Sequence, residues 1–305
     1  MPKRSTIHDP RSTKNIYVVI LVGGKGKRLR PLSTDAKPKA FISVTKDRKT
    51  MFRRTLDRAR KITASSNIIV AANARHEALV RKDFPGIKKD NLLLEPVSRN
   101  TAPAIAMAAS ILKKRCDGAV MLVVHSDQYI IGEKEFFDSV RNGVDFIRGR
   151  KSAIAIVGIR PSVASTELGY IRVQGLGSRV QGIFKAREFV EKPDARTAEK
   201  YLGSGDYLWN AGVFIFKPEM ILNAFKKHAP KIYDLAVRAA GIDDTYERMP
   251  DISIDHAVLE NTSGIYCVMG SYRWLDLGTF ENIRKVLERE SRDFVLKDGK
   301  MIKII

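Results

Sequence analysis

The chain has 305 residues, of which 44% are hydrophobic and 29% are charged, and it carries a formal charge of +20 at pH 7. This composition excludes collagen-like, disordered and disulfide-rich classes, and a chain of this length buries a large core without covalent crosslinks. The two cysteines, Cys116 and Cys267, stand far apart with no Cys-x-x-Cys or Cys/His ligand spacing. A structural zinc site is therefore not expected, and the cysteine content fits a reducing, cytoplasmic location.

The N-terminal end is strongly basic, since residues 1–60 contain 17 Lys and Arg against 4 Asp and Glu. An anionic ligand is expected near this end. The basic residues alternate with glycines rather than with aromatic residues, so we favour the phosphates of a small molecule and expect no nucleic-acid partner. The apolar run that follows the first 15 residues covers only 16–22, which is too short for a signal-peptide core or a membrane span. We therefore expect a cytoplasmic protein with no membrane partner.

Short β-branched runs alternate with helical patterns in the first half of the chain, which is typical of βαβ units and an α/β fold with a mostly parallel sheet. Shorter strands punctuated by glycines follow, so a parallel half precedes a mixed half. The expected strands are 16–22, 67–72, 92–95, 119–124, 152–159, 169–174, 187–191 and 212–216, and the expected helices are 51–62, 102–115 and 133–147.

No repeat, low-complexity tract or linker divides the chain, which predicts one continuous domain over 16–292. A basic N-terminal tail, 1–15, precedes it, and a C-terminal tail, 293–305, follows. The C-terminal tail has two apolar runs around Asp298-Gly299, the pattern of a β-hairpin. Such a hairpin is marginal unless it docks on the body or on a partner chain, which hints at a homodimer.

A glycine-rich loop follows the first predicted strand and reads GGKGKR over 23–28. It lies at the carboxyl edge of the sheet, where open α/β folds bind ligands. Gly23, Gly24 and Gly26 let backbone N–H groups approach phosphate oxygens, and Arg28 adds charge. The spacing fits neither the P-loop nor the dinucleotide pattern. The loop alone favours phosphate binding over an ordinary glycine turn.

The loop continues as RLRPLS over 28–33 and KPK over 37–39, and together these residues resemble the N-terminal signature of sugar-phosphate nucleotidyltransferases. EPVSRNTAPAI at 95–105 resembles a segment of mannose-1-phosphate guanylyltransferases. Three later segments match the same family in register: FVEKP at 189–193, YLWNAG at 207–212 and SIDHAV at 253–258.

The resemblance runs from about residue 16 to 281 and implies a Rossmann-like nucleotidyltransferase core. It implies an enzyme that transfers GMP from GTP to mannose 1-phosphate, or to a similar sugar 1-phosphate, with release of pyrophosphate. Because a phosphate monoester has a second pKa of about 6, the attacking oxygen is already ionised and no strong base is needed. The difficulty is to hold two polyanions in line. Arg28 and Lys39 match the family's triphosphate-binding cations, with Lys39 on the attacked α-phosphate.

Asp127 follows a predicted strand within the apolar stretch MLVVHSD, where an unpaired carboxylate is costly. A metal ion would explain it, and a helix cap or turn is the alternative. The resemblance supplies a second acid, Asp276, in WLDLG at 274–278. Two acids of this kind with substrate phosphates are typical of Mg²⁺.

The resemblance assigns the remaining site residues. Glu95 would accept hydrogen bonds from guanine, or pair with Arg99 instead, and Asn100 and Thr101 would meet the nucleotide at a helix N-terminus or act only as caps. The sugar phosphate would contact residues spread over three segments: Gly169, Tyr170, Glu191, Lys192, Asn210 and Gly212.

Several positions depart from the family pattern. Ala40 stands where Gln is common, Gln128 where His is usual, and Arg30 where an aromatic residue is expected. These changes leave the phosphate cations and metal acids in place but keep three alternatives open: another sugar phosphate or nucleotide, a homologue that senses sugar nucleotides without turnover, and, from the charge alone, a nucleic-acid-binding protein. We expect no appended β-helix or isomerase domain in 305 residues.

Overall fold

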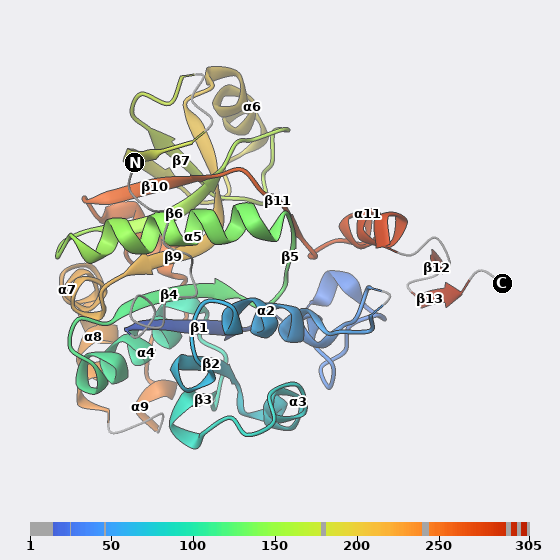
Figure 1. Ribbon diagram of the computed structural model, residues 1–305, viewed down its shortest axis with the longest axis horizontal. Helices are drawn as coiled ribbons and strands as arrows, with labels where there is room; N and C mark the ends of the chain where they lie inside the picture. Colours follow the sequence, from blue (N-terminus) through green and yellow to red (C-terminus); the bar gives the residue numbers. More distant parts are fainter. Residues whose placement is uncertain are drawn as a thin grey trace, which may run out of the picture.

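A mixed β-sheet of nine strands forms the centre of the part of the chain that the structure describes (Figure 1). The structure is a computed structural model and describes residues 15–24, 26–45, 47–177, 181–239, 244–290, 294–297 and 300–303. The basic tail, except residue 15, lies outside these ranges. Among the described residues, no helix is long and apolar enough to cross a membrane.

The sheet has the order β3-β2-β1-β4-β9-β6-β10-β8-β7. The pairings leave β8 and β9 antiparallel to the other seven strands, so the sheet is mixed but mostly parallel, as the sequence predicts. The strands are β1 (Ile16–Val22), β2 (Ile68–Asn73), β3 (Leu92–Glu95), β4 (Val120–His125), β6 (Ile154–Ile159), β7 (Tyr170–Val173), β8 (Ile183–Val190), β9 (Tyr207–Phe216) and β10 (Ile265–Gly270).

Two short antiparallel pairs stand apart from this sheet. The first joins β5 (Gln128–Ile131) to β11 (Arg273–Asp276). The second joins β12 (Phe294–Lys297) to β13 (Lys300–Lys303) and is the hairpin that the C-terminal tail predicts. Figure 1 shows it beyond α11 (Phe280–Glu290), at the edge of the molecule.

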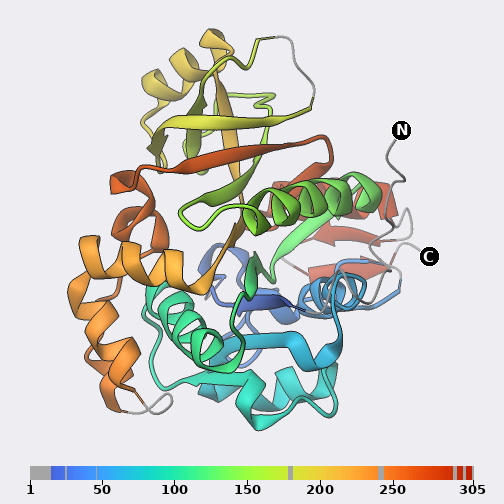
Figure 2. The same cartoon turned by 60° about the vertical axis from the view of Figure 1, so that its left-hand side comes forward.

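Helices cover both faces of the sheet, so the fold has three layers. The alternation of side chains along β1 shows the two faces: Val18 and Ile20 join one core cluster, and Val19 and Leu21 join the other. The first cluster packs under α2 (Met51–Arg60), α3 (Glu77–Asp83) and α5 (Glu133–Arg148), and the second under α4 (Thr101–Arg115), α7 (Pro218–His228) and α8 (Pro230–Arg238). Figure 2 shows α7 and α8 beside α4.

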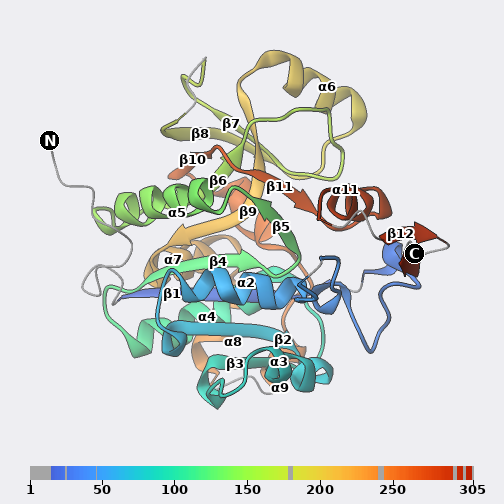
Figure 3. The same ribbon diagram turned by 45° about the vertical axis from the view of Figure 1, so that its right-hand side comes forward.

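Smaller elements complete the fold around this core. Helix α6 (Ala195–Ser204) covers an aromatic cluster that contains Tyr170, Tyr207 and Trp209, above the sheet's far end. Helix α11 packs through Ile283 and Leu287 on the loop after β1 (Figure 3). The short helices α9 (Asp244–Glu247) and α10 (Ile254–Ala257) follow α8.

The sequence locates most N-terminal elements within two residues, and β1 and β3 have the predicted bounds. Strand β8 begins at Ile183 rather than at 187, and β9 begins at Tyr207 rather than at 212. The predicted strand missed YLWNA because Asn and Gly interrupt its apolar pattern. In the structure the register of β9 shifts between its pairings with Ile156 and Gly158, which marks a bulge. A bulge interrupts the regular alternation of side chains along a strand, so the apolar pattern is broken there.

The topology places the site. The carboxyl ends of β1, β2, β3 and β4 meet at one edge of the sheet, and strand order reverses between β1 and β4, which opens a crevice there. Because β9 runs antiparallel to β4, with Val213 opposite Val124, its bulged segment reaches the same edge. Residues from both halves of the chain therefore meet at this edge.

The core position of β9 yields a stability prediction. Phe216 is fully buried between Met121 of β4 and Ile154 of β6. Phe216→Ala should lower the free energy of unfolding by about 3–5 kcal/mol because it leaves a cavity in a packed core. Urea denaturation would measure this, with Val163→Ala as the control, since Val163 is 58% exposed. Equal midpoints for the two variants would contradict the assigned packing.

Candidate active site

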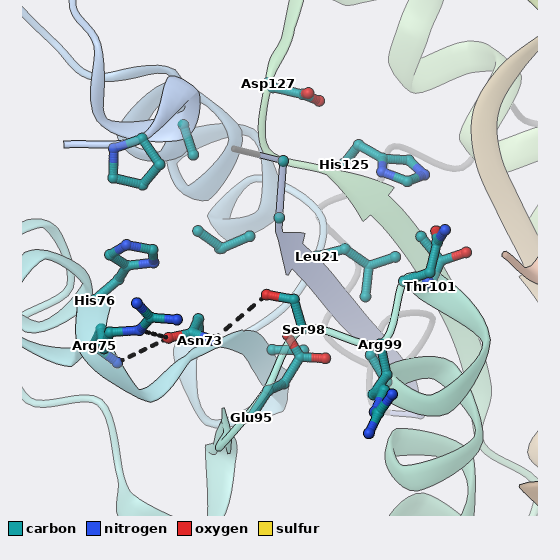
Figure 4. A pocket seen from close by; sticks show the side chains of 18 of the residues that line it. Leu21, Asn73, Arg75, His76, Glu95, Ser98, Arg99, Thr101, His125 and Asp127 are labelled. Carbon is teal, nitrogen blue, oxygen red and sulfur yellow. Dashed lines mark hydrogen bonds between the residues drawn. The ribbon is translucent and has the colours of Figure 1, made fainter. Parts of the chain in front are cut away.

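A cavity of about 600 Å³ lies at the carboxyl ends of β1 to β4 (Figure 4). Its wall contains several cationic side chains and carboxylates besides glycines and apolar residues. The polar and glycine residues that line it are Gly23, Gly24, Lys27, Arg30, Thr34, Asp35, Asn73, Arg75, His76, Glu95, Ser98, Arg99, Asn100, Thr101, His125, Asp127 and Lys192. The cavity thus collects the glycine loop, the 95–101 segment and Asp127, which are far apart in sequence.

The glycine loop forms one wall of the cavity through Gly23 and Gly24. Gly26 lies behind them with a φ of +59°, and a Cβ there would come within 2.9 Å of Ser33 Oγ and 3.2 Å of Lys39 Cβ. The Ser33 hydroxyl donates to the Gly26 carbonyl at 2.6 Å. Glycine at this position therefore lets the loop lie directly against Lys39.

Lys39 and Asp127 form an ion pair with 2.9 Å between Nζ and Oδ2. Lys39 opens a short 3₁₀ turn whose next residues, Ala40 and Phe41, are buried in the core and fix its backbone. Burial raises the pKa of Asp127, but the Lys39 ammonium and His125 outweigh burial and hold the pKa below its usual value. Asp127, which lines the cavity, is therefore ionised at neutral pH.

Asp276, the second predicted metal ligand, lies close to Asp127 in the pairing of β5 with β11. Asp276 ends β11 and pairs with Gln128, the residue after Asp127, although its side chain lies outside the described part. Among the described residues, no three His, Cys, Asp or Glu side chains form a metal site. An ionised carboxylate is still a donor that suits Mg²⁺, which takes one or two carboxylates and completes its shell with water and phosphates.

Arg28 lies away from the cavity. Its guanidinium donates to Glu167 at 2.6 Å, and both side chains are more than half exposed. Lys27 and Arg30 line the cavity in its place, and Arg30 pairs with Asp35 at 2.8 Å. Lys25 is outside the described residues. An exposed pair such as Arg28–Glu167 contributes little to stability, so Arg28 can change partner at small cost.

Glu95 lies at the end of β3 and lines the cavity, but only 8% of its surface is exposed. The hydroxyl of Tyr246 on α9 donates to Glu95 Oε1. Burial raises the pKa of Glu95 to about 7, against the opposing effect of the Tyr246 hydrogen bond. The alternative pairing of Glu95 with Arg99 is not seen, because Arg99 donates to the carbonyl of Glu247 at 2.6 Å.

Asn100 and Thr101 line the cavity at the start of α4. The Asn100 side chain caps the helix by accepting from the Thr101 N–H at 3.0 Å, and the Thr101 hydroxyl accepts from the Ile254 N–H at 2.8 Å. Asn100 has a φ of 61°, and Lys192, which also lines the cavity, has a φ of 48°. Non-glycine residues in this conformation are uncommon and cluster at functional sites.

The predicted sugar-phosphate residues form a second cluster beside the cavity. Lys192 Nζ lies 2.6 Å from Glu191, and Asn210 donates to Asp255 at 3.2 Å while accepting from the Gly212 N–H at 2.9 Å. A Cβ at Gly169 would lie 2.5 Å from Glu191 Oε2 and 3.3 Å from Asn210 Cβ. Tyr170, in contrast, is fully buried, and its hydroxyl accepts from the Ser165 N–H at 2.8 Å.

Gln128 links the two parts of the site. Its amide donates to the Ala211 carbonyl at 2.7 Å, and its backbone carbonyl accepts from the buried Arg58 at 3.3 Å. Burial lowers the pKa of Arg58 to about 10. Gly212 has a φ of +64°, and a Cβ there would lie 2.9 Å from Gln128 Nε2. The Asp127 loop is therefore joined to the bulge of β9.

Sequence reasoning missed Asp255 and Tyr246. Asp255 stands in the SIDHAV segment, and its half-buried carboxyl accepts a hydrogen bond from the Asn210 amide. Burial, together with the negative charge of Glu191, raises the pKa of Asp255 to about 7. The SIDHAV segment, which resembles the family, could therefore have pointed to Asp255. Nothing in the local sequence marks Tyr246, because its contact with Glu95 joins residues 151 positions apart.

Comparison with known proteins agrees with this geometry. A family model described as nucleotidyl transferase matches residues 17–292. The chain belongs to the nucleotidyl transferase family. The match covers the described sheet and the cavity, and it ends before the C-terminal hairpin.

Named relatives and a solved structure support membership of the nucleotidyl transferase family. The chain is 35% identical over 294 residues to mannose-1-phosphate guanylyltransferase RfbM of Salmonella typhimurium and 32% identical over 288 residues to mannose-1-phosphate guanylyltransferase of Escherichia coli. These alignments cover 92% and 89% of this chain, which spans about 60% of the length of either relative. A structure from Thermus thermophilus, described as mannose-1-phosphate geranyltransferase, matches with a TM-score of 0.81 and 30% identity over 90% of this chain and 79% of that one.

The raised pKa of Glu95 makes folding depend on pH. An acid with a pKa of about 7 when folded and about 4.3 when unfolded binds its proton more tightly in the folded state. Its contribution to the free energy of unfolding therefore falls as pH rises through this window, by at most roughly 4 kcal/mol. Glu95→Gln should remove this decline, so the variant gains stability over the wild type between about pH 5 and 7.5.

Urea denaturation at several pH values measures this difference in the free energy of unfolding. Asp255, whose pKa is also raised to about 7, titrates in the same window but contributes equally in both proteins, so its effect cancels. Glu199→Gln, at an exposed position, is the control and should follow the wild-type profile. A constant difference between Glu95→Gln and the wild type across this window would show that Glu95 does not titrate there.

Proposed function

We propose that this chain transfers GMP from GTP to mannose 1-phosphate, or to a similar sugar 1-phosphate, and releases pyrophosphate. The observation that carries the proposal is the Lys39–Asp127 pair beside the glycine loop, at the carboxyl edge of the sheet. A cavity of about 600 Å³ lies within the range of small-molecule sites. The names of the relatives supply the substrate pair.

The reaction needs cations more than it needs a base. An ionised oxygen of the sugar phosphate attacks the α-phosphorus of GTP, the new phosphorus–oxygen bond forms, and pyrophosphate leaves with the electrons of the broken bond. Charge gathers on the α-phosphate oxygens as this happens. Lys39 would leave Asp127 and donate to these oxygens, and Arg28 would leave Glu167 to bind the leaving phosphates. The glycine loop would add backbone N–H donors.

Mg²⁺ fits the donors on this edge. Asp127 and Asp276 would hold it, since β5 and β11 bring the two residues into neighbouring register. When bound, the ion neutralises phosphate charge and orients the triphosphate. The residues of the chain then keep the two anions in line.

The cavity and the cluster beside it would select the two substrates. Glu95 would accept from the N1–H and the exocyclic amine of guanine, with the start of α4 beneath the nucleotide. Lys192 would bind the sugar phosphate, and Glu191, Asn210 and the backbone at Gly169 and Gly212 would meet the sugar hydroxyls. A homodimer and a cytoplasmic location stay predictions from the sequence.

A pyrophosphate-release assay with Mg²⁺ tests this function, crossing GTP, ATP, UTP, CTP and dTTP with mannose, glucose and other sugar 1-phosphates. We expect the fastest release with GTP and mannose 1-phosphate. Release with another pair would support the same reaction but with different substrates. Ala40 and Gln128, which depart from the family pattern, make this outcome worth testing. No release with any pair, from folded protein that binds nucleotide, would replace the enzyme with a sensing homologue.

Lys39 should be essential for turnover. Lys39→Met should lower kcat by about 10²–10³-fold, because it removes the donor to the charge that develops on the α-phosphate. Pyrophosphate release under saturating substrates measures this loss, and thermal unfolding checks the fold. Lys134→Met, at a side chain that is 83% exposed, is the control. A kcat indistinguishable from that of the wild type would remove Lys39 from the reaction.

Asp127 should set the requirement for metal. Asp127→Asn keeps the size of the side chain but weakens an oxygen donor, so half-maximal activity should need about tenfold more Mg²⁺ or more. A titration of activity against Mg²⁺ gives this value. Asp145→Asn, at a side chain that is 57% exposed, serves as the comparison. Identical Mg²⁺ curves for Asp127→Asn and wild type would leave the metal assignment without support.

A further inference from the structure

The segment that contains α9 and α10 backs the nucleotide side of the cavity. Four hydrogen bonds join it to the stretch from Glu95 to the start of α4. They connect Tyr246 to Glu95, Arg99 to the Glu247 carbonyl at 2.6 Å, the Ala102 N–H to the Ile252 carbonyl at 3.2 Å, and the Ile254 N–H to Thr101 at 2.8 Å. These bonds tie the segment to the cavity wall, although it lies about 150 residues away in sequence.

Tyr246 is the one residue in these four hydrogen bonds that reaches a carboxylate lining the cavity. Its side chain is fully buried and belongs to the same core cluster as α4 and α8. Its hydroxyl donates to Oε1 of Glu95, and burial together with the Glu95 charge raises the pKa of the phenol, which stays protonated and remains a donor. The packed ring leaves this donor little freedom to turn away.

We propose that Tyr246 is a positioning residue for nucleotide selection: its hydroxyl holds the Glu95 carboxylate, ionised and correctly turned, for the N1–H and exocyclic amine of guanine. The inference rests on the proposed function, which assigns the guanine base to this end of the cavity. Each carboxylate oxygen has two lone pairs, so Oε1 can accept from Tyr246 and from the base at once. Adenine presents an acceptor at N1, which an ionised carboxylate repels.

Protonation gives this arrangement a measurable signature. With its pKa near 7, Glu95 loses its proton as pH rises through neutrality, and only the ionised form accepts both guanine donors. GTP should therefore bind more tightly as pH rises from about 6 to about 8. Without the Tyr246 donor the pKa of Glu95 rises further, so the same tightening should move to higher pH. The charged groups that act on Tyr246, besides Glu95, are Arg99 and Asp251, and Arg75 lines the same cavity as Glu95.

The experiment measures the dissociation constants of GTP, ITP and ATP by calorimetry on the full chain, without sugar phosphate, from about pH 6 to about pH 9. For Tyr246→Phe we expect GTP to bind about tenfold more weakly at pH 7, and the loss to shrink at pH 9. ITP lacks the exocyclic amine and should lose less, and ATP should be unaffected. Tyr272→Phe is the matched control, because Tyr272 is also buried and its hydroxyl has no hydrogen-bond partner among the described residues.

A double-mutant cycle separates positioning from packing. Glu95→Gln should weaken GTP binding and flatten its pH dependence, and Tyr246→Phe should add nothing in that background. Equal weakening of GTP and ATP, an undiminished loss at pH 9, or additive losses in the cycle would each overturn the role of Tyr246. If Tyr246→Phe does not fold, Glu95→Gln decides: a flattened pH profile supports the arrangement, and an unchanged one rejects it.

Failure of the proposed function gives a different pattern. Selective GTP binding with the expected Tyr246→Phe loss, but no pyrophosphate release with any sugar phosphate, would reject the transferase and keep the role of Tyr246. Turnover with GTP, together with an unchanged dissociation constant of GTP in Tyr246→Phe, would support the transferase and reject the role of Tyr246. Wild-type protein that binds ATP as tightly as GTP would overturn the guanine-reading role of both residues.

Discussion

The ion pair between Lys39 and Asp127 is the interaction on which the site depends. It joins Lys39, which lies against the glycine loop, to the carboxylate of Asp127 just beyond the end of β4, and both side chains are mostly buried. A buried charge without its partner is costly, so each residue keeps the other in place until a ligand takes over. In the proposed reaction the triphosphate would replace Asp127 as the partner of Lys39, and Asp127 would then be free to hold Mg²⁺. The pair thus holds both functional groups at one point.

The sheet topology explains how this point could serve the two proposed substrates. The reversal of strand order beside β1 opens the crevice, and the antiparallel insertion of β9 brings a bulged segment from the second half of the chain to the same edge. The Gln128 amide then fixes the bulge at Ala211 to the loop that carries Asp127. The parallel strands that carry the proposed nucleotide side and the strands β7, β8 and β9 that carry the proposed sugar side are therefore held together at this edge.

Local signals predicted the residues that act through their own segment. The β1 strand, the loop of glycines and the Asn100 cap each follow from neighbouring residues, and the structure places them at the cavity. Local sequence patterns could not predict contacts between residues that are far apart in the chain. The pairing of Arg28 with Glu167, the bond from Tyr246 to Glu95 and the hold of Asp255 on Asn210 join residues between 45 and 151 positions apart. The first half of β9 was missed because a bulged strand breaks the alternation that identifies strands.

A crystal structure of the protein with Mg²⁺ and a non-hydrolysable GTP analogue would test the proposed reaction most directly. The proposed reaction predicts that Lys39 has left Asp127 and donates to the α-phosphate, that Asp127 coordinates the metal, and that guanine faces Glu95. An intact Lys39–Asp127 pair, with the triphosphate bound at the Arg75 and His76 side of the cavity, would contradict it.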